Sequence, residues 1–247
     1  MPHSGKTLVA IATFNEIETL PRLVDEIRRD LATADILVID DSSPDGTGQW
    51  CEEKAATDQG FKCLHRQGKL GLGTALVAAM RYAIDRRTEY SYLVTMDADF
   101  SHPSERLPTL VALMDPPGGS GVDVAIGSRY IPGGGIEGWP LSRHVMSRAV
   151  NLVARWLLCL SPRDSSSGFR CYRVDLLARM DLEAIRSRGY SFEEEVLWRL
   201  KRLGARFGEV PIRFVNRRHG ASKISPRELA TSACILLRLA VRTWLRL

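Results

Sequence analysis

Short hydrophobic runs alternate along the first half of the chain with longer stretches in which apolar residues recur every three to four positions. The runs are rich in β-branched residues and nearly continuous, which is typical of strands buried on both faces of a sheet. They cover residues 7–12, 36–40, 92–97 and 122–126. Helical patterns follow at about residues 19–31, 46–56, 74–87 and 104–114. This alternation predicts an α/β fold with a mostly parallel, Rossmann-like sheet flanked by helices, in which ligands bind at the carboxyl ends of the strands.

The pattern changes after residue 129. Residues 131–138 contain four glycines and a proline and are expected to form a loop. A basic, polar segment covers residues 217–225, and a final amphipathic helix is expected over 226–247. Between these segments we expect an amphipathic helix over 143–160, a loop over 161–168, a short strand near 169–173, and helices around 174–180 and 192–203. The sequence therefore predicts one catalytic domain, residues 1–225, followed by the C-terminal helix, residues 226–247.

Composition excludes several classes of protein. The longest stretch without a charged residue is residues 70–80, which is too short to cross a bilayer, and the N-terminus lacks the pattern of a signal peptide. The five cysteines are scattered and form no C-x-x-C pair, so neither a disulfide framework nor a zinc site is expected, and a reducing cytosol fits. The formal charge of +5 favours anionic partners such as nucleotides, phosphates or acidic lipids. Nucleic acid is not expected as a partner, because no recognition motif accompanies this charge.

Two acidic motifs directly follow predicted strands. Asp97 and Asp99 end the strand over 92–97, and an extended backbone there would point both carboxylates to one side, where a divalent cation could bridge them to a diphosphate. Ser101 lies two positions further on and could supply a third oxygen. The competing interpretation is a pair of acidic residues that cap a loop. The segment DDSSPDGT over 40–47 is equally consistent with a capping turn and with a carboxylate that accepts hydrogen bonds from a base or a ribose.

A glycine pair opens the helix predicted over 74–87. Gly71 and Gly73 could bring backbone N–H groups near a phosphate, but Leu76 occupies the third glycine position of the dinucleotide-binding motif. Close packing at the start of this helix is therefore the favoured role of the glycines.

Taken in order, these segments resemble the family-2 glycosyltransferases of the GT-A fold, and among them the mannose synthases that act on dolichyl or polyprenyl phosphate. Each matching segment is modest by itself, but together and in order they cover nearly the whole chain. The resemblance rests on ATFNE (12–16), DDSSPDGT (40–47), GKLGLGTA (68–75), MDADFSHP (96–103), GSRYIPGGGIEGW (127–139), SGFRCYR (167–173), GYSFEEE (189–195) and VNRRHGASKI (215–224).

The resemblance implies roles for particular residues. Asp97 and Asp99 would hold Mg²⁺ or Mn²⁺ on the sugar-nucleotide diphosphate, with Ser101 as a further ligand. Arg143 and Ser147 would meet the acceptor phosphate or the sugar. The nucleotide-sugar would be bound by Ala12, Phe14, Glu16, Val38, Asp40, Asp97, Ala98, Asp99, Arg129, Arg217 and Lys223.

The same resemblance implies the reaction: inverting, metal-dependent transfer of mannose from GDP-mannose to dolichyl or polyprenyl phosphate. A phosphate monoester is already anionic near neutral pH, so it needs no protein base to attack the anomeric carbon. The Q-x-x-R-W motif of related polysaccharide synthases is not found. Residues 193–195 are accordingly interpreted as acidic residues of a helix N-terminus without a catalytic role, and Asp164 as a loop cap or a substrate-orienting group. Two alternatives stay open, a transferase that uses a UDP-sugar and a non-catalytic subunit that binds nucleotide-sugar and recruits a partner to the membrane.

The C-terminal segment carries a basic stripe. Arg238, Arg242 and Arg246 recur every four residues among apolar side chains, a pattern typical of a helix that lies in a membrane interface. Packing of this helix on the domain or on a partner, such as a small membrane subunit, is the alternative. Because the acceptor is a lipid, we expect a cytoplasmic protein that is peripheral on the cytosolic face of a membrane.

Overall fold

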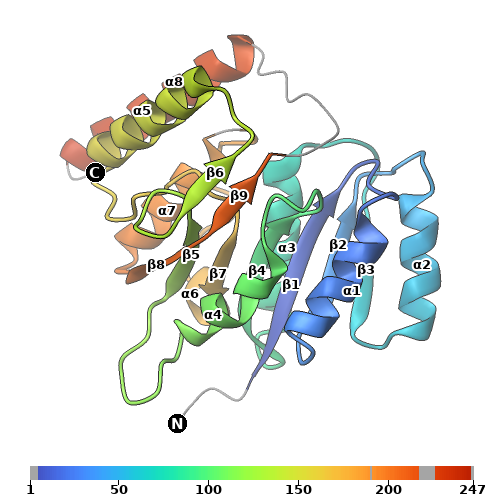
Figure 1. The fold of residues 1–247 in the computed structure, drawn as a ribbon. Helices are drawn as coiled ribbons and strands as arrows, with labels where there is room; N and C mark the ends of the chain where they lie inside the picture. The colour runs from blue at the N-terminus through green and yellow to red at the C-terminus, as the bar shows by residue number, and fades with distance from the viewer. Residues whose placement is uncertain (1–4, 190, 217–225, 246–247) are drawn as a thin grey trace.

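The computed structural model describes residues 5–189, 191–216 and 226–245, and its centre is a seven-stranded sheet flanked by helices (Figure 1). The strand order is β3-β2-β1-β4-β7-β5-β8, and only β7 runs antiparallel to its neighbours. A separate two-stranded parallel sheet pairs β6 with β9. The strands are β1 (Lys6–Thr13), β2 (Asp35–Asp40), β3 (Phe61–His65), β4 (Tyr90–Asp97), β5 (Val124–Ser128), β6 (Gly135–Glu137), β7 (Arg170–Arg173), β8 (Phe207–Pro211) and β9 (Arg213–Val215).

Helices cover both faces of the large sheet, because consecutive side chains of each strand point to opposite faces. On β1, Leu8 and Ala10 belong to one buried cluster, while Val9 and Ile11 belong to the other. The first cluster includes apolar residues of α3 and α7, and the second includes those of α1 and α4. The helices are α1 (Leu20–Asp30), α2 (Thr47–Thr57), α3 (Leu72–Asp85), α4 (Leu107–Ala112), α5 (Leu141–Leu158), α6 (Val174–Leu177), α7 (Phe192–Arg202) and α8 (Pro226–Trp244), with a single 3₁₀ turn, η1 (Ser104–Arg106), before α4.

The α/β architecture and the mostly parallel sheet confirm the predictions from the hydrophobic pattern. Three details were wrong. The loop predicted over 131–138 contains strand β6, which is held by pairing with β9, more than 70 residues away in the sequence. Strands β3, β8 and β9 were not predicted. The helix predicted over 104–114 consists of η1 and a shorter α4.

Helices α5 and α8 pack against each other beside the sheet (Figure 1). Leu239 and Ala240 of α8 are buried against the rest of the chain, and the indole of Trp156 on α5 lies 5.9 Å from that of Trp244 on α8. Within the part of the chain that the structure describes, no helix has the length and hydrophobicity that a bilayer span requires.

Candidate active site

The candidate site lies where β1, β2 and β4 end side by side. Thr13 of β1 is in register with Asp40 of β2, and Ala12 is in register with Asp97 of β4. The loops after these strands therefore meet at one edge of the sheet, as the parallel topology predicts.

Each of these loops contains a non-glycine residue in the left-handed region of backbone conformation. The φ angles are 62° at Asn15, 56° at Ser42 and 60° at Phe100. Such conformations cost free energy and persist where the surrounding structure fixes them, and they cluster at functional sites. Their presence after three neighbouring strands marks this edge as a candidate binding site by backbone geometry alone.

A cavity of about 750 Å³ opens at the same edge. It brings together three residues that the resemblance assigns to nucleotide-sugar binding, Phe14 and Glu16 after β1 and Asp99 after β4. The sequence analysis did not identify the other lining residues, which come largely from the loop between β1 and α1, from α1 and from the end of β9: Asn15, Ile17, Glu18, Thr19, Arg22, Glu26, Asp45, Phe100, Val215 and Asn216. The strand-end position of residues 14–19 could have indicated some of them, whereas β9 was not predicted as a strand.

The aspartate pair has the donor chemistry that a hard divalent cation prefers. Asp97 ends β4 with its side chain about one-third exposed, and Asp99 lines the cavity. Ser101 donates its backbone N–H to Asp99 Oδ1 at 3.0 Å, and its own hydroxyl is buried without a hydrogen-bond partner among the described residues. Two carboxylates and an unsatisfied hydroxyl fit Mg²⁺ or Mn²⁺, which bind oxygen ligands. The described residues contain no group of three His, Cys, Asp or Glu side chains that could hold a metal, so a cation here would take its remaining ligands from other oxygens.

His102 holds the backbone of this motif in place. Its Nδ1 accepts a hydrogen bond from the backbone N–H of Asp97 at 3.0 Å, and its ring stacks on Phe169 at 5.3 Å. Burial lowers the pKa of His102, which keeps the imidazole neutral and able to accept this bond. The sequence analysis quoted His102 only as part of a motif and gave it no role.

Two residues assigned to the nucleotide are enclosed in the fold. Val38 is completely buried in the core, so it exposes no atom to a nucleotide in this structure. Asp40 is 1% exposed, and its carboxylate accepts hydrogen bonds from Thr13 and Ser43. The Asp40 carboxylate is therefore used within the turn that follows β2. Ala12 is half-buried and Ala98 is buried.

Arg129 is also buried, in an ion pair with Asp164. Asp164 Oδ2 accepts the backbone N–H of Arg129 at 2.9 Å and its Nε–H at 2.7 Å, while Oδ1 accepts from Nη2 at 2.7 Å. Ser166 accepts a further hydrogen bond from Nη2 at 2.8 Å. Asp164 is therefore the counter-ion that orients Arg129, and contact of Arg129 with a phosphate stays a prediction.

The two residues assigned to the acceptor lie on α5. The guanidinium of Arg143 lies 4.0 Å from the ring centroid of Trp139, and it donates a 3.4 Å hydrogen bond to Asn216, which lines the cavity. Ser147 Oγ lies 2.7 Å from the hydroxyl of Tyr130. Arg217 and Lys223 lie outside the described residues, and so does Arg246 of the basic stripe.

A buried acidic cluster stands at the start of α7, behind the site. Glu193 pairs with the fully buried Arg170 at 2.7 Å, and burial nevertheless raises the pKa of Glu193. Burial raises the pKa of Glu194 to about 8, and Glu194 Oε2 has no hydrogen-bond partner among the described residues. The predicted position at a helix N-terminus is correct, but no pattern in the sequence indicates that these carboxyls are enclosed.

Comparison with known proteins gives a consistent result. The family model described as glycosyl transferase family 2 matches residues 8–181. An undecaprenyl-phosphate mannosyltransferase of Micrococcus luteus is 44% identical over 220 residues, covering 89% of this chain and 88% of that protein. A polyprenol monophosphomannose synthase of Mycolicibacterium smegmatis is 42% identical over 221 residues, covering 89% of this chain and 81% of that protein.

Solved structures share the fold at low sequence identity. Staphylococcus aureus TarS 1–349 in complex with UDP-GlcNAc superposes with a TM-score of 0.62 and 19% identity, covering 95% of this chain and 66% of that one. Glucosyl-3-phosphoglycerate synthase from Mycobacterium tuberculosis, in complex with Mn²⁺, UDP and glucosyl-3-phosphoglycerate, gives a TM-score of 0.58 and 19% identity, covering 98% of this chain and 80% of that one. These likenesses establish the GT-A fold.

Proposed function

The chain belongs to glycosyl transferase family 2, and from this premise we propose that it transfers mannose from GDP-mannose to dolichyl or polyprenyl phosphate, giving polyprenyl-phosphate mannose. The observation that carries the proposal is the identity of 44% and 42%, over 89% of the chain, to two proteins named for mannose transfer to such lipid phosphates. The cavity at the carboxyl ends of β1 and β4 is the place where the nucleotide-sugar would bind.

In this proposal Asp97, Asp99 and Ser101 would hold Mg²⁺ or Mn²⁺ at the donor diphosphate. When bound, the metal would supply positive charge against the negative charge that develops on the departing GDP. Phe14 and Glu16, which line the cavity, would contact the nucleotide, together with Ala12 on β1 and Ala98 beside the aspartate pair.

The acceptor phosphate would bind on the α5 side of the site. Arg143 and Ser147 orient its oxygens, and Arg129, Arg217 and Lys223 add positive charge toward the phosphates. A phosphate oxygen attacks the anomeric carbon as the bond from that carbon to the diphosphate oxygen breaks, and the electron pair leaves with GDP. Attack opposite the leaving group inverts the anomeric configuration. The attacking oxygen carries no proton, so the chain needs no general base.

The outer faces of α5 and α8 suit contact with a membrane, where such an acceptor resides. Within the described residues these helices expose eleven large apolar side chains: Leu141, Val145, Met146, Val150, Leu152, Val153 and Trp156 on α5 or at its start, and Leu237, Val241, Trp244 and Leu245 on or just after α8. An apolar face of this kind next to arginines is typical of helices that lie in a membrane interface. We therefore propose a protein peripheral on the cytosolic face of a membrane, with residues 1–225 as the catalytic domain and 226–247 as an appended interface helix.

The test is formation of lipid-extractable product in detergent from labelled GDP-mannose and a short polyprenyl phosphate, with Mg²⁺ or Mn²⁺. We expect labelled lipid that EDTA abolishes and that Asp97→Asn and Asp99→Asn each reduce at least 100-fold, because each removes a charged ligand. Asp25→Asn, at an exposed aspartate of α1, is the matched control and should retain full activity. If labelled lipid forms from UDP-glucose but not from GDP-mannose, the donor is a UDP-sugar and the mannose assignment is wrong. Tight nucleotide-sugar binding without transfer would favour the non-catalytic subunit.

A further inference from the structure

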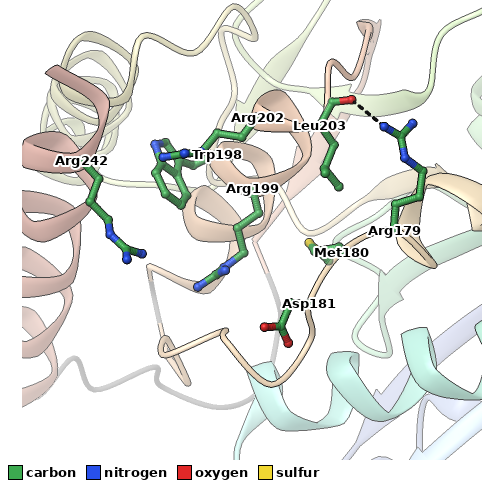
Figure 2. A pocket seen from close by; sticks show the side chains of 8 residues that line it. All are labelled: Arg179, Met180, Asp181, Trp198, Arg199, Arg202, Leu203 and Arg242. Carbon is green, nitrogen blue, oxygen red and sulfur yellow. Dashed lines mark hydrogen bonds between the residues drawn. The ribbon is translucent and has the colours of Figure 1, made fainter. Parts of the chain in front are cut away.

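Six arginines line a groove between α7 and α8, and none of them lines the cavity of the candidate active site. Figure 2 shows the larger part of this groove, with Arg179, Arg199, Arg202 and Arg242. The groove consists of two adjoining cavities, of about 300 Å³ and 170 Å³, which share Arg199 and Arg242. In Figure 2 the side chains of these two residues point toward one another from the two helices. We call this feature the arginine groove and define it by Arg179, Arg186, Arg199, Arg202, Arg238 and Arg242.

The positive charge of the groove exceeds the negative charge that lines it. Two carboxylates, Asp181 and Glu195, are the acidic residues among its described lining. Glu195 is already occupied by Arg199 at 2.6 Å and by the backbone N–H groups of Arg186 and Ser187. Asp181 accepts two backbone N–H groups of the turn that follows it. The groove therefore concentrates a surplus of about four charges in a chain whose total surplus is +5.

The two walls of the groove are held together by packing rather than by charge. Trp198 of α7 is 3% exposed, and its indole N–H donates a 2.7 Å hydrogen bond to Thr243 of α8. Leu239 and Ala240 are buried beside it. The backbone that carries Arg238 and Arg242 is therefore already fixed, so a ligand would not lose binding free energy to the ordering of this helix.

Helix geometry places these two arginines at the border of the apolar face. Each residue advances an α-helix by about 100°, so Arg238 and Arg242 lie roughly a quarter-turn from Leu237 and Val241. Leu237 and Val241 are 57% and 54% exposed, whereas Leu239, on the other side of the arginines, is buried. When apolar side chains enter a membrane interface, cations at such a border reach the level of the lipid phosphates.

We infer that the arginine groove binds the phosphate headgroups of anionic membrane lipids. Guanidinium groups suit this ligand because they donate paired hydrogen bonds to phosphate oxygens. The inference rests on the membrane placement proposed above, but it adds a site and a lipid class that the transfer reaction does not require. It predicts that the enzyme distinguishes acidic from neutral membranes.

The experiment compares flotation of the full-length chain with vesicles of phosphatidylcholine and with vesicles that also contain phosphatidylglycerol. The test variant is Arg238→Gln/Arg242→Gln. The matched control is Arg87→Gln/Arg106→Gln, which removes two exposed arginines that do not line the groove. An arginine near an acidic membrane surface strengthens binding about fivefold. The test variant should therefore bind the acidic vesicles about 25-fold more weakly than the wild-type chain. The control variant should bind them about as tightly as the wild-type chain, because its two arginines do not line the groove.

Two further measurements separate the outcomes. The test variant should transfer mannose in detergent as fast as the wild-type chain. If the wild-type chain shows no transfer but still prefers acidic vesicles, the proposed reaction is overturned and the inference about the arginine groove is not. The conservative variant Arg238→Lys/Arg242→Lys should restore most of the acidic-vesicle binding. The inference is overturned if the test variant and the control bind acidic vesicles equally, or if the wild-type chain does not prefer them. It is also overturned if inorganic phosphate without vesicles binds the groove, seen as a change in tryptophan fluorescence that Trp198→Phe abolishes, while lipid binding survives in the test variant.

Discussion

The ion pair between Arg129 and Asp164 gives the sharpest test of how the site is built. Asp164 is fully buried and Arg129 is 9% exposed, and the aspartate accepts three hydrogen bonds from the arginine at 2.7–2.9 Å. Asp164→Asn keeps the size of the side chain but removes the counter-charge. A buried cation is then left uncompensated, which costs about 3–5 kcal/mol. For a chain of this length we expect a fall of about 6–20 °C in Tm.

The free energy of unfolding is best measured by urea denaturation of both proteins, with a check that the slope against urea concentration is unchanged. Glu183→Gln is the matched control, because Glu183 also pairs with an arginine but is 80% exposed, and its loss should cost less than about 1 kcal/mol. Arg129→Gln in the Asp164→Asn background should restore part of the lost stability, since it removes the unpaired charge. A cost below about 1 kcal/mol for Asp164→Asn would refute the view that Asp164 is the counter-ion of a buried Arg129.

Two more predictions concern stability. Burial raises the pKa of Glu194 to about 8 from an ordinary 4.5, so the folded chain holds a proton that the unfolded chain has lost. This proton should therefore make stability fall as pH rises from about 5 to 8, by up to about 1.4 kcal/mol per pH unit. Glu194→Gln should remove this contribution but not that of Glu193, whose pKa burial also raises, in urea denaturation at pH 5.5, 7 and 8.5. An equal slope in both proteins would contradict the assignment. A Cβ on Gly73 would lie 2.9 Å from Phe192 Cδ2 and 3.0 Å from the carbonyl oxygen of Arg188, so Gly73→Ala should destabilise by about 1–3 kcal/mol. Gly189→Ala, where a Cβ meets nothing within 4 Å, should cost much less when both variants are compared by thermal denaturation. Similar costs for the two would argue against close packing at the start of α3.

Much of the site could be placed from sequence because its chemistry follows directly after strongly patterned strands. Asp97 and Asp99 end a buried strand, and Phe14 and Glu16 follow another, so the parallel topology alone predicts that they meet. Val38 shows the limit of this reasoning. The resemblance assigned it to the nucleotide, but neighbours from β1 and β3 enclose it completely.

Local sequence patterns are enough to predict the alternation of strands and helices, the strand-end position of the aspartate pair and the amphipathic character of the C-terminal helix. These features depend on short-range periodicity, that is, on residues a few positions apart. Long-range packing, in contrast, pairs Arg129 with Asp164, encloses Glu194 and pairs β6 with β9. It also gathered arginines from residue 179 to residue 242 into one groove. Contacts between residues separated by tens of positions depend on how whole helices and strands pack, so local sequence patterns do not predict them.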